Sequence, residues 1–422
     1  MTIVGLDDTD SREHGMCTTY LAALVAEAIE DAGGTVERRL LVRLNPAVEY
    51  KTRGNAALAL HTDLDPDRAL ELAREHLTRF AVVDDDRTSP GLVVADDSPE
   101  AVPEAVAAFA RDAVRDHHDV ADAVDLLDAT GYRHAGWDGG RGRIGALAAV
   151  GAYRAFAEWT YEHISYREFD RCGTPRDVDE ASVFAAAADG YPSVWDTVDR
   201  AERQAVCVPS APGPILHGIR GDDPDAVREV AAAIESEPVE RAATFLTNQG
   251  TDAHLRDGDV GDLRDGRAYC VTGTVATDPE TRAGGHTFLS VRDGDEDLDC
   301  AAFEPTKRFR DRVRALRPGD RVTVCGEVAR GTLKLEKFAV RDLVETERAV
   351  PECPDCGRSM ESAGAAQGYR CRDCGTSRPD KVEVPVERAL EPGWYEVPPC
   401  ARRHVAKPLI RGGFDAPVHP ER

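Results

Sequence analysis

The chain has 422 residues, and its 77 Asp and Glu residues outnumber its 52 Lys and Arg residues, which gives a formal net charge of -25. A chain of this length exceeds the size at which one hydrophobic core keeps growing, so we expect several domains. The acidic composition, with only six lysines, indicates adaptation to high salt. It excludes nucleic-acid binding through a broadly basic surface, because molar salt leaves little free energy to gain from counterion release.

The N-terminal segment carries neither a basic stretch nor a long apolar run, and no apolar run of about 18 residues occurs elsewhere in the sequence. We therefore expect a cytoplasmic protein with no membrane contact. Four of the eleven cysteines form one tight cluster, and the other seven are scattered singly. In a cytoplasmic chain we expect scattered cysteines to be small buried hydrophobic residues.

The first 130 residues alternate between apolar strand patterns and helical patterns with apolar residues three or four positions apart. We expect strands at residues 2–6, 37–44, 54–61 and 91–95, and helices at residues 17–32, 65–80 and 99–114. This alternation predicts one α/β domain over residues 1–130.

A basic, glycine-rich turn with Arg141 and Arg143 precedes an apolar helix at residues 144–155. A helix near residues 225–235 and a strand at residues 242–247 follow. We predict a second domain over residues 131–265, with a ferredoxin-like α+β fold.

Residues 266–346 change to short strand patterns. We expect strands at residues 268–275, 287–292, 298–303, 321–328 and 333–344, and a helix at residues 306–316. Five strands with one helix between the third and the fourth is the order of an OB-fold barrel. Tyr269, Phe288 and Phe303 could stack on bases, although alternate strand positions face the core, which favours simple packing.

Two cysteine pairs lie in the last region, over residues 347–422. Cys353 and Cys356 are separated by two residues, and so are Cys371 and Cys374. Two such pairs can each hold one side of a tetrahedral ion, so we predict a structural zinc ribbon; a redox pair is the alternative. Four thiolates fill the coordination sphere of zinc, and we assign no catalysis to it.

Acidic residues follow the first strand directly, at Asp7, Asp8 and Asp10, and a helix begins soon after. Carboxylates in this position could hold Mg²⁺ on a nucleotide whose phosphates lie at the helix N-terminus. A solvated acidic surface is the alternative, because acidic runs are frequent in this chain. Thr18 could contact a phosphate, or it could simply cap the helix.

A polar, cationic element joins the second and third strands. Its members are Arg43, Asn45, Lys51, Thr52, Arg53 and Asn55, and Gly54 allows a close approach of the backbone. If these cations faced the acidic loop, they would complete a triphosphate clamp. Near the end of the chain, Arg402, Arg403, His404 and Lys407 form a basic cluster in an acidic protein. We interpret this cluster as a contact to an RNA backbone.

Six motifs resemble those of archaeal tRNA-Ile 2-agmatinylcytidine synthetase (TiaS). They are GLDDTDS at residues 5–11, GMCTTY at 15–20, RLNP at 43–46, YKTRGN at 50–55, RIGAL at 143–147 and TNQGTD at 247–252. With the predicted barrel and zinc ribbon in the same order, the resemblance covers nearly the whole chain.

The resemblance implies a kinase-like N-terminal domain, a ferredoxin-like domain, an OB fold and a zinc ribbon. It implies an enzyme that uses ATP and Mg²⁺ to attach agmatine to the wobble cytidine of tRNA-Ile with a CAU anticodon, releasing AMP and phosphate, with no obligate protein partner. Asp7, Asp8, Asp10 and Thr18 would be catalytic, with Asp7 and Asp8 on Mg²⁺. The residues expected at ATP are Thr9, Ser11, Lys51, Arg53 and Asn55, and those expected at agmatine are Gly250 and Asp252.

Two other interpretations remain open at this point. The chain could be a nucleic-acid-binding protein without catalysis, built on the barrel and the zinc ribbon. It could also be a Mg²⁺-dependent phosphatase with Asp7 or Asp8 as its nucleophile, which would leave the last third of the chain without a role.

Overall fold

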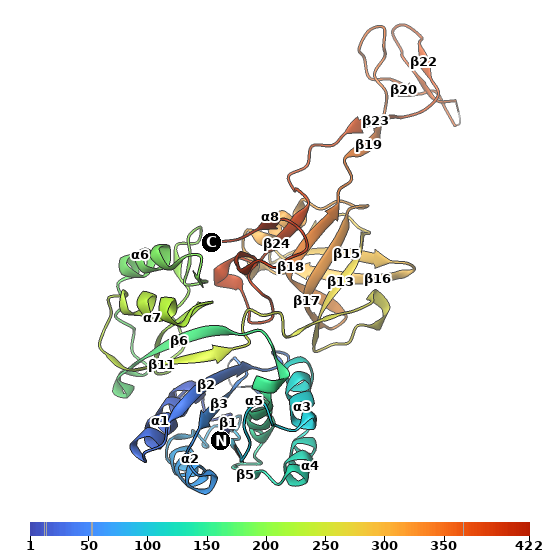
Figure 1. Ribbon diagram of the computed structural model, residues 1–422. Helices are drawn as coiled ribbons and strands as arrows, with labels where there is room; N and C mark the ends of the chain where they lie inside the picture. Colours follow the sequence, from blue (N-terminus) through green and yellow to red (C-terminus); the bar gives the residue numbers. More distant parts are fainter. Residues whose placement is uncertain (12, 14, 52–53, 366) are drawn as a thin grey trace.

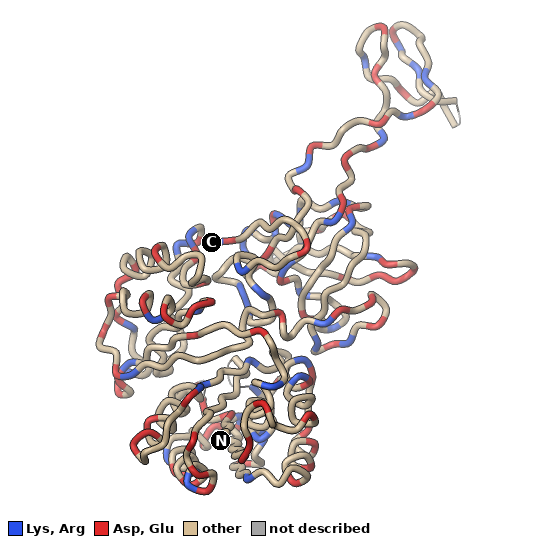
Figure 2. The backbone as a smooth tube through the Cα atoms, in the orientation of Figure 1, with Lys and Arg blue, Asp and Glu red and all other residues tan. Residues whose placement is uncertain are grey.

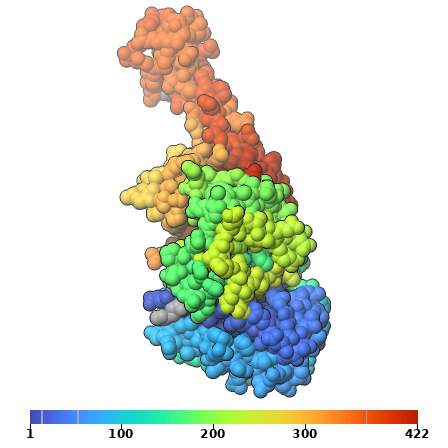
Figure 3. All heavy atoms as spheres, turned by 90° about the vertical axis from the view of Figure 1, so that its left-hand side faces the viewer, coloured from blue at the N-terminus to red at the C-terminus, as the bar shows by residue number. Residues whose placement is uncertain are grey.

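The computed structural model describes residues 1–11, 13, 15–51, 54–365 and 367–422. It has a broad α/β body, a barrel beside that body and a narrow arm that projects from the barrel (Figure 1, Figure 3). Acidic residues occur in all of these parts (Figure 2). This distribution fits the acidic, salt-adapted surface that the composition predicts.

Five antiparallel strands of the N-terminal part form one side of a nine-stranded sheet. In spatial order they are β5 (Arg133–Gly136), β4 (Gly91–Ala95), β1 (Thr2–Asp7), β3 (Ala56–Thr62) and β2 (Val36–Arg43). The helices are α1 (Thr18–Asp31), α2 (Pro66–Phe80), α3 (Glu104–Arg115), α4 (Val120–Thr130) and α5 (Arg143–Ala155). Because side chains alternate along a strand, Val4 packs with α1 and α2 while Ile3 packs with α3 and α5 on the other face.

Both β5 and α5 lie beyond residue 130, where we predicted the first domain to end. β5 nevertheless pairs with β4, and α5 packs on β1. Gly5 of β1 allows this close approach, because a Cβ atom there would lie 2.3 Å from the carbonyl oxygen of Ala146. In packing terms the first unit therefore extends to the end of α5.

The other side of the sheet comes from residues 160–247. Its strands are β11 (Val239–Thr247), β6 (Thr160–Arg167), β10 (Ile215–Gly221) and β7 (Val194–Trp195), covered by α6 (Glu180–Gly190) and α7 (Pro224–Ala232), with a small hairpin of β8 (Val198–Asp199) and β9 (Gln204–Ala205). β11 pairs with β6 and also runs parallel to β2, where Leu246 lies opposite Leu40. The two predicted α/β domains thus share one continuous sheet.

A closed barrel of five strands follows. Its strands are β13 (Arg267–Val275), β15 (Thr287–Asp293), β16 (Glu296–Ala302), β17 (Arg321–Ala329) and β18 (Thr332–Asp342), with α8 (Phe309–Arg314) between β16 and β17 and short β12 (Leu255–Asp257) and β14 (Glu280–Thr281) at its edges. β17 pairs with both β13 and β18, and β16 runs parallel to β18, which closes the barrel. The predicted order of five strands and one helix matches this barrel.

The arm begins where β19 (Thr346–Ala349) pairs with β23 (Val382–Pro385), and it ends in three short strands (Figure 1). These are β20 (Glu361–Ser362), β21 (Tyr369–Arg370) and β22 (Ser377–Arg378). The chain then returns to the barrel, where β24 (Gly393–Glu396) pairs with β18 and β25 (Val418–His419) pairs with β24. The tail that we grouped with the zinc ribbon therefore packs on the barrel.

Two scattered cysteines depart from the expectation of single buried residues. Cys270 of β13 and Cys325 of β17 lie opposite each other in the ladder and form a disulfide. The strand register, which the spacing of cysteines in the sequence does not reveal, brings them together. Across the described residues, every helix is too short or too polar to cross a lipid bilayer.

Candidate active site

A cavity of about 440 Å³ lies where the two sides of the large sheet meet. Its walls come from the end of β1, the start of α1, the β2–β3 connection, the start of α5, β6 and the segment before β10. Of the residues predicted to be functional, Asp7, Asp8, Asp10, Thr18, Lys51 and Asn55 line it. Residues from separate motifs therefore meet in one place.

The carboxylates of Asp7 and Asp8 are fixed by backbone geometry. Asp8 has a left-handed φ of 60°, and its carboxylate accepts hydrogen bonds from the Ser89 backbone N–H at 3.1 Å and from Arg141 Nη2 at 3.0 Å. Asp7 Oδ1 accepts the Asp8 N–H at 2.7 Å. The first turn of α5 leaves room for Asp7 because residue 145 is glycine; a Cβ atom there would lie 1.9 Å from Asp7 Oδ2.

Burial and mutual repulsion make this pair hard to ionise. Burial raises the pKa of Asp7 well above its usual value, and the neighbouring Asp8 raises it further. Burial also raises the pKa of Asp8 to about 6, although Arg141 and the Ser89 N–H act in the opposite direction. Two adjacent carboxylates whose charges Arg141 balances only in part form a suitable site for a cation.

Thr18 is the first residue of α1, and it is not the helix cap. The N-cap is Cys17, which makes no side-chain capping bond. Thr18 Oγ accepts a hydrogen bond from Thr9 Oγ at 3.2 Å. The capping alternative for Thr18 is therefore wrong, and its hydroxyl lies at the wall of the cavity.

The remaining predicted ATP residues differ in position. Thr9 and Ser11 are fully buried and are not part of the cavity wall, and Ser11 Oγ donates to Asp85. Lys51 Nζ donates to the carbonyl oxygen of Pro46, and Asn55 Nδ2 donates to that of Asn45 at 2.6 Å. Thr52 and Arg53 lie outside the described residues.

Sequence reasoning gave no role to two charged residues of the wall, Arg141 and Glu162. Arg141 was noticed only as part of a basic turn, and it pairs with Asp8. Glu162 of β6 is buried between Arg43 Nη2 at 3.0 Å and Arg220 Nε at 3.2 Å. Burial raises the pKa of Glu162, but the two arginines together lower it below its usual value. Arg43, which we predicted in the cationic element next to the acidic loop, lines the cavity and pairs with Glu162.

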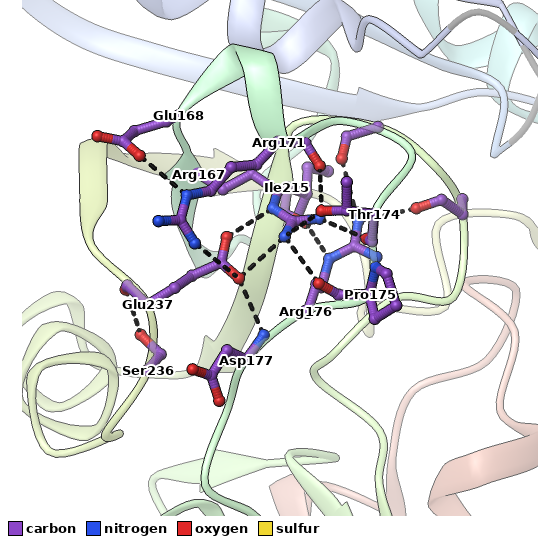
Figure 4. A network of polar contacts seen from close by, with 12 residues as sticks. Arg167, Glu168, Arg171, Thr174, Pro175, Arg176, Asp177, Ile215, Ser236 and Glu237 are labelled. Carbon is purple, nitrogen blue, oxygen red and sulfur yellow. Dashed lines mark hydrogen bonds and ion pairs between the residues drawn. The ribbon is translucent and has the colours of Figure 1, made fainter.

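Another part of the wall is held by a buried ion pair (Figure 4). Arg167 Nε lies 2.7 Å from Glu237 Oε1, and both side chains are almost fully buried. Arg167 also donates to the carbonyl oxygens of Thr174 and Pro175, which fixes the loop that leads to Arg176. Arg176 lines the cavity and donates to the carbonyl oxygen of Ile215 at 2.7 Å.

The TNQGTD motif lies at a junction between parts of the fold, outside the cavity wall. The Asn248 side chain pairs with both the N–H and the carbonyl of Arg43. Asp252 Oδ2 pairs with Lys337 of the barrel, and the carbonyl oxygen of Gly250 accepts a hydrogen bond from Arg411. Because the charge of Asp252 is already matched, this placement gives no support to an agmatine site at Gly250 and Asp252.

The basic cluster of the tail is also neutralised by carboxylates. Arg402 pairs with Asp196 and Glu396, and its side chain is only 5% exposed. Arg403 pairs with Glu327 and Glu336, and Lys407 pairs with Glu158. The partly buried His404 ring lies against His254. These contacts join the tail to the barrel and to the sheet. They give no support to the predicted RNA contact, for which exposed cations would be needed.

The four cysteines of the arm converge as predicted. Their sulfur atoms all lie within 4.8 Å of one another, with Cys353 3.2 Å from Cys374 and Cys356 3.5 Å from Cys371. Tetrahedral zinc with Zn–S bonds of about 2.3 Å needs sulfur atoms about 3.8 Å apart, so the set fits zinc after a small expansion. Gly357 and Gly375 each have a φ of 72°, which gives the two cysteine knuckles the same turn.

Comparison with known proteins agrees with this arrangement. Three family models match the chain: the TiaS TCKD domain at residues 3–64, the TiaS FLD domain at residues 140–254 and the TiaS C-terminal zinc ribbon domain at residues 350–390. The 2-agmatinylcytidine synthetase TiaS of Haloquadratum walsbyi, which acts on an isoleucine tRNA, is 60% identical, with all of both chains covered. The chain belongs to the TiaS family of 2-agmatinylcytidine synthetases.

Solved structures of this family have the same fold. A crystal structure of TiaS in complex with its isoleucine tRNA and ATP is 40% identical with a TM-score of 0.90, covering 100% of this chain and 99% of the other. A crystal structure of TiaS with the same tRNA, AMPCPP and agmatine is 37% identical with a TM-score of 0.88 and the same coverage. This chain therefore has the mixed α/β fold of the family, with a small barrel and a zinc ribbon domain.

Proposed function

We propose that this protein joins agmatine to C2 of the wobble cytidine of tRNA-Ile with a CAU anticodon, using ATP and giving 2-agmatinylcytidine, AMP and phosphate. One observation carries the proposal: the acidic loop, Thr18, Lys51 and Arg141 line one cavity in a chain that matches a synthetase of this activity over its whole length. The family's complexes with an isoleucine tRNA, ATP and agmatine support the same three substrates here.

The cavity suits the chemistry that this reaction requires. The 2-oxo group of cytosine is a poor leaving group, so one phosphoryl group of ATP is first transferred to that oxygen, and the agmatine amine then attacks C2 and expels it as phosphate. Formation of AMP also requires that water cleaves the α–β phosphate bond of ATP, so each turnover releases two phosphates. Lys51 and Arg141 would neutralise the phosphates of ATP, and the Thr18 hydroxyl would contact the transferred group. Agmatine must enter the same cavity, because its amine has to reach the activated carbon.

We assign a Mg²⁺ site to Asp7 and Asp8. Their buried carboxylates carry raised pKa values and one arginine partner, Arg141, which is partly exposed. Oxygen ligands of this kind suit Mg²⁺, which would supply charge neutralisation for the phosphates of ATP. Asp10, also at the wall, would extend this acidic surface toward the nucleotide.

The finer domain names are part of the proposal. We assign a kinase-like domain to the N-terminal strands, a ferredoxin-like domain to the segment from β6 to β11, an OB fold to the barrel and a zinc ribbon to the arm. The ladder β13–β15–β16–β18–β17 supports the OB fold, because it closes in the strand order of that barrel. The packing of α5 joins residues 143–155 to the N-terminal strands, whereas the TiaS FLD domain model begins at residue 140.

The test is incorporation of labelled agmatine into a tRNA-Ile transcript with a CAU anticodon, with ATP and Mg²⁺ in high salt. We expect wild type to incorporate the label and Asp8→Asn to lose at least about 1,000-fold in rate, because the substitution removes a carboxylate from the proposed Mg²⁺ site that neutralises the phosphates. Asp225→Asn is the matched control, since Asp225 is an exposed residue at the start of α7. Turnover of ATP without tRNA would favour a phosphatase, and tRNA binding without incorporation would favour a binding protein.

A further inference from the structure

Tyr50, on the connection between β2 and β3, has an unusual environment. Its side chain lines the cavity, and it is 62% exposed. Among the large hydrophobic residues that the structure describes, the next most exposed is Val239 at 46%. An aromatic ring left in water contributes little to the folded core, so its position calls for another explanation.

One neighbour of Tyr50 links it to the acidic loop. The Arg141 guanidinium lies 5.2 Å from the centroid of the Tyr50 ring, within the range of a cation–π contact. The same guanidinium pairs with the Asp8 carboxylate at 3.0 Å. Arg141 therefore places the ring beside the carboxylates at which we locate the phosphates. Among the described residues, the aromatic contact of the ring is the one with this guanidinium, and the side chain is 62% exposed.

A planar aromatic ring with an open surface suits one class of ligand especially well. Nucleobases stack on aromatic side chains, and a cation beside the ring strengthens such contacts. Stacking also suits this protein's charge, because salt screens contacts between ions much more than contacts between rings. A chain with a net charge of -25 gains little from attraction to phosphates and needs recognition of this kind.

We propose that Tyr50 is a stacking platform for a nucleobase that enters the cavity. This inference rests on the proposed function, which brings two bases to the site: the wobble cytosine of the tRNA and the adenine of ATP. Both present the same aromatic chemistry to the ring. Tyr50 is thus a binding residue that positions a base next to Asp7 and Asp8, separate from the groups that act on the phosphates.

The experiment compares Tyr50→Leu, which keeps apolar bulk but removes the π face, with Tyr50→Phe, which keeps the ring. For each variant we would measure KM for tRNA and KM for ATP in agmatine incorporation. We expect Tyr50→Leu to raise one KM by about 10- to 100-fold and Tyr50→Phe to stay within about twofold of wild type. Phe169→Ala is the matched control, because Phe169 is 43% exposed and is not part of the cavity wall.

The pattern of change identifies the base. A higher KM for tRNA with an unchanged KM for ATP means that the cytosine stacks on Tyr50, whereas the reverse means that the adenine does. If wild type is active and Tyr50→Leu changes neither KM, the stacking proposal is wrong. Because Tyr50 is exposed, we expect all variants to unfold at the wild-type temperature.

A binding measurement separates this proposal from the proposed function. We would place pyrrolocytidine, a fluorescent cytosine analogue that stacking quenches, at the wobble position of the transcript and measure its emission with and without ATP. If wild type incorporates no agmatine, the proposed function fails, yet quenching that is lost in Tyr50→Leu still supports the platform. Equal quenching in wild type and Tyr50→Leu, together with an unchanged affinity for ATP, overturns it.

Discussion

Buried carboxylates occur in two kinds of surroundings in this protein. Two of them hold the wall of the cavity in place: Glu162 lies between Arg43 and Arg220, and Glu237 pairs with Arg167. Burial raises the pKa of both glutamates, but their arginine partners lower it below the usual value. In the acidic loop, burial raises the pKa of Asp7 and Asp8, and Arg141 is too weak a partner to reverse the shift.

This difference separates structural acids from functional ones. A matched carboxylate is most stable ionised within the protein itself, so it holds the fold together. A buried carboxylate whose charge is only partly balanced lowers the stability of the fold. We expect such a residue to be retained where a ligand supplies the missing positive charge. Residue type does not distinguish the two groups in a chain with 77 acidic residues, whereas their partners do.

Removing one carboxylate from each region gives the sharpest contrast. Glu237→Gln leaves the Arg167 guanidinium buried without its counter-charge, so we expect the free energy of unfolding to fall by about 3–5 kcal/mol. Asp8→Asn removes a repulsion, so we expect equal or higher stability together with lost activity. Urea unfolding of both variants in the absence of Mg²⁺ measures this. Equal destabilisation by the two substitutions would contradict the distinction.

The pH dependence of stability tests the junction between the sheet and the tail. Burial lowers the pKa of His254 from 6.5 to about 4, and Arg115 and Arg43 act in the same direction. The unfolded chain therefore binds more protons than the folded chain between pH 6.5 and pH 4. The stability that His254 contributes is complete above pH 6.5, and it is lost as pH falls through this window, by up to about 3 kcal/mol.

The measurement is the unfolding temperature of wild type and His254→Gln between pH 7 and pH 4. Gln can still donate to the carbonyl oxygen of Leu44, which His254 Nε2 contacts at 3.3 Å, but it cannot take up a proton. We expect the variant to have the shallower slope against pH. Parallel curves would mean that other groups titrate in this window.

Local sequence patterns predicted the strands and helices of this fold better than they predicted which strands pair with each other. The expected strand at residues 321–328 is β17 (Arg321–Ala329), and the expected helix at residues 65–80 is α2 (Pro66–Phe80). β11 pairs with β2, although the two strands are about 200 residues apart in the sequence. The alternation of apolar and polar residues within a strand does not indicate which strand it pairs with. The same limit applies to Cys270 and Cys325, which only the barrel register brings together.

The site shows the same division. Position after the first strand was enough to identify Asp7, Asp8 and Asp10, because a loop that leaves a buried strand places its side chains at the sheet edge. Composition did not reveal the ion pairs of the tail, where Arg402 pairs with the nearby Glu396 of β24 and Arg403 pairs with Glu327 of the distant strand β17. The role of Asp252 at agmatine stays a prediction, and its pairing with Lys337 could not be foreseen because Lys337 lies 85 positions further along the chain.

Lys337 offers the smallest expected effect and a test of the junction that links the barrel to the cavity. Its side chain is 1% exposed, pairs with Asp252 and lies 4.8 Å from the Phe414 ring centroid. In Lys337→Met the apolar contacts remain, and the carboxylate of Asp252, which is 30% exposed, can turn to water. We therefore expect a loss of about 2 kcal/mol, smaller than for Glu237→Gln.

The same substitution should affect tRNA more than ATP. Lys337 lies on β18 of the barrel, and Asp252 follows β11, so their ion pair sets the barrel against the sheet that carries the cavity. We expect Lys337→Met to raise KM for tRNA severalfold while KM for ATP stays unchanged. Lys334→Met, on the same strand, is the control, because its pair with Glu327 is partly exposed and contributes at most about 1 kcal/mol. Equal effects of the two lysine substitutions would show that the buried pair has no special part in orienting the barrel.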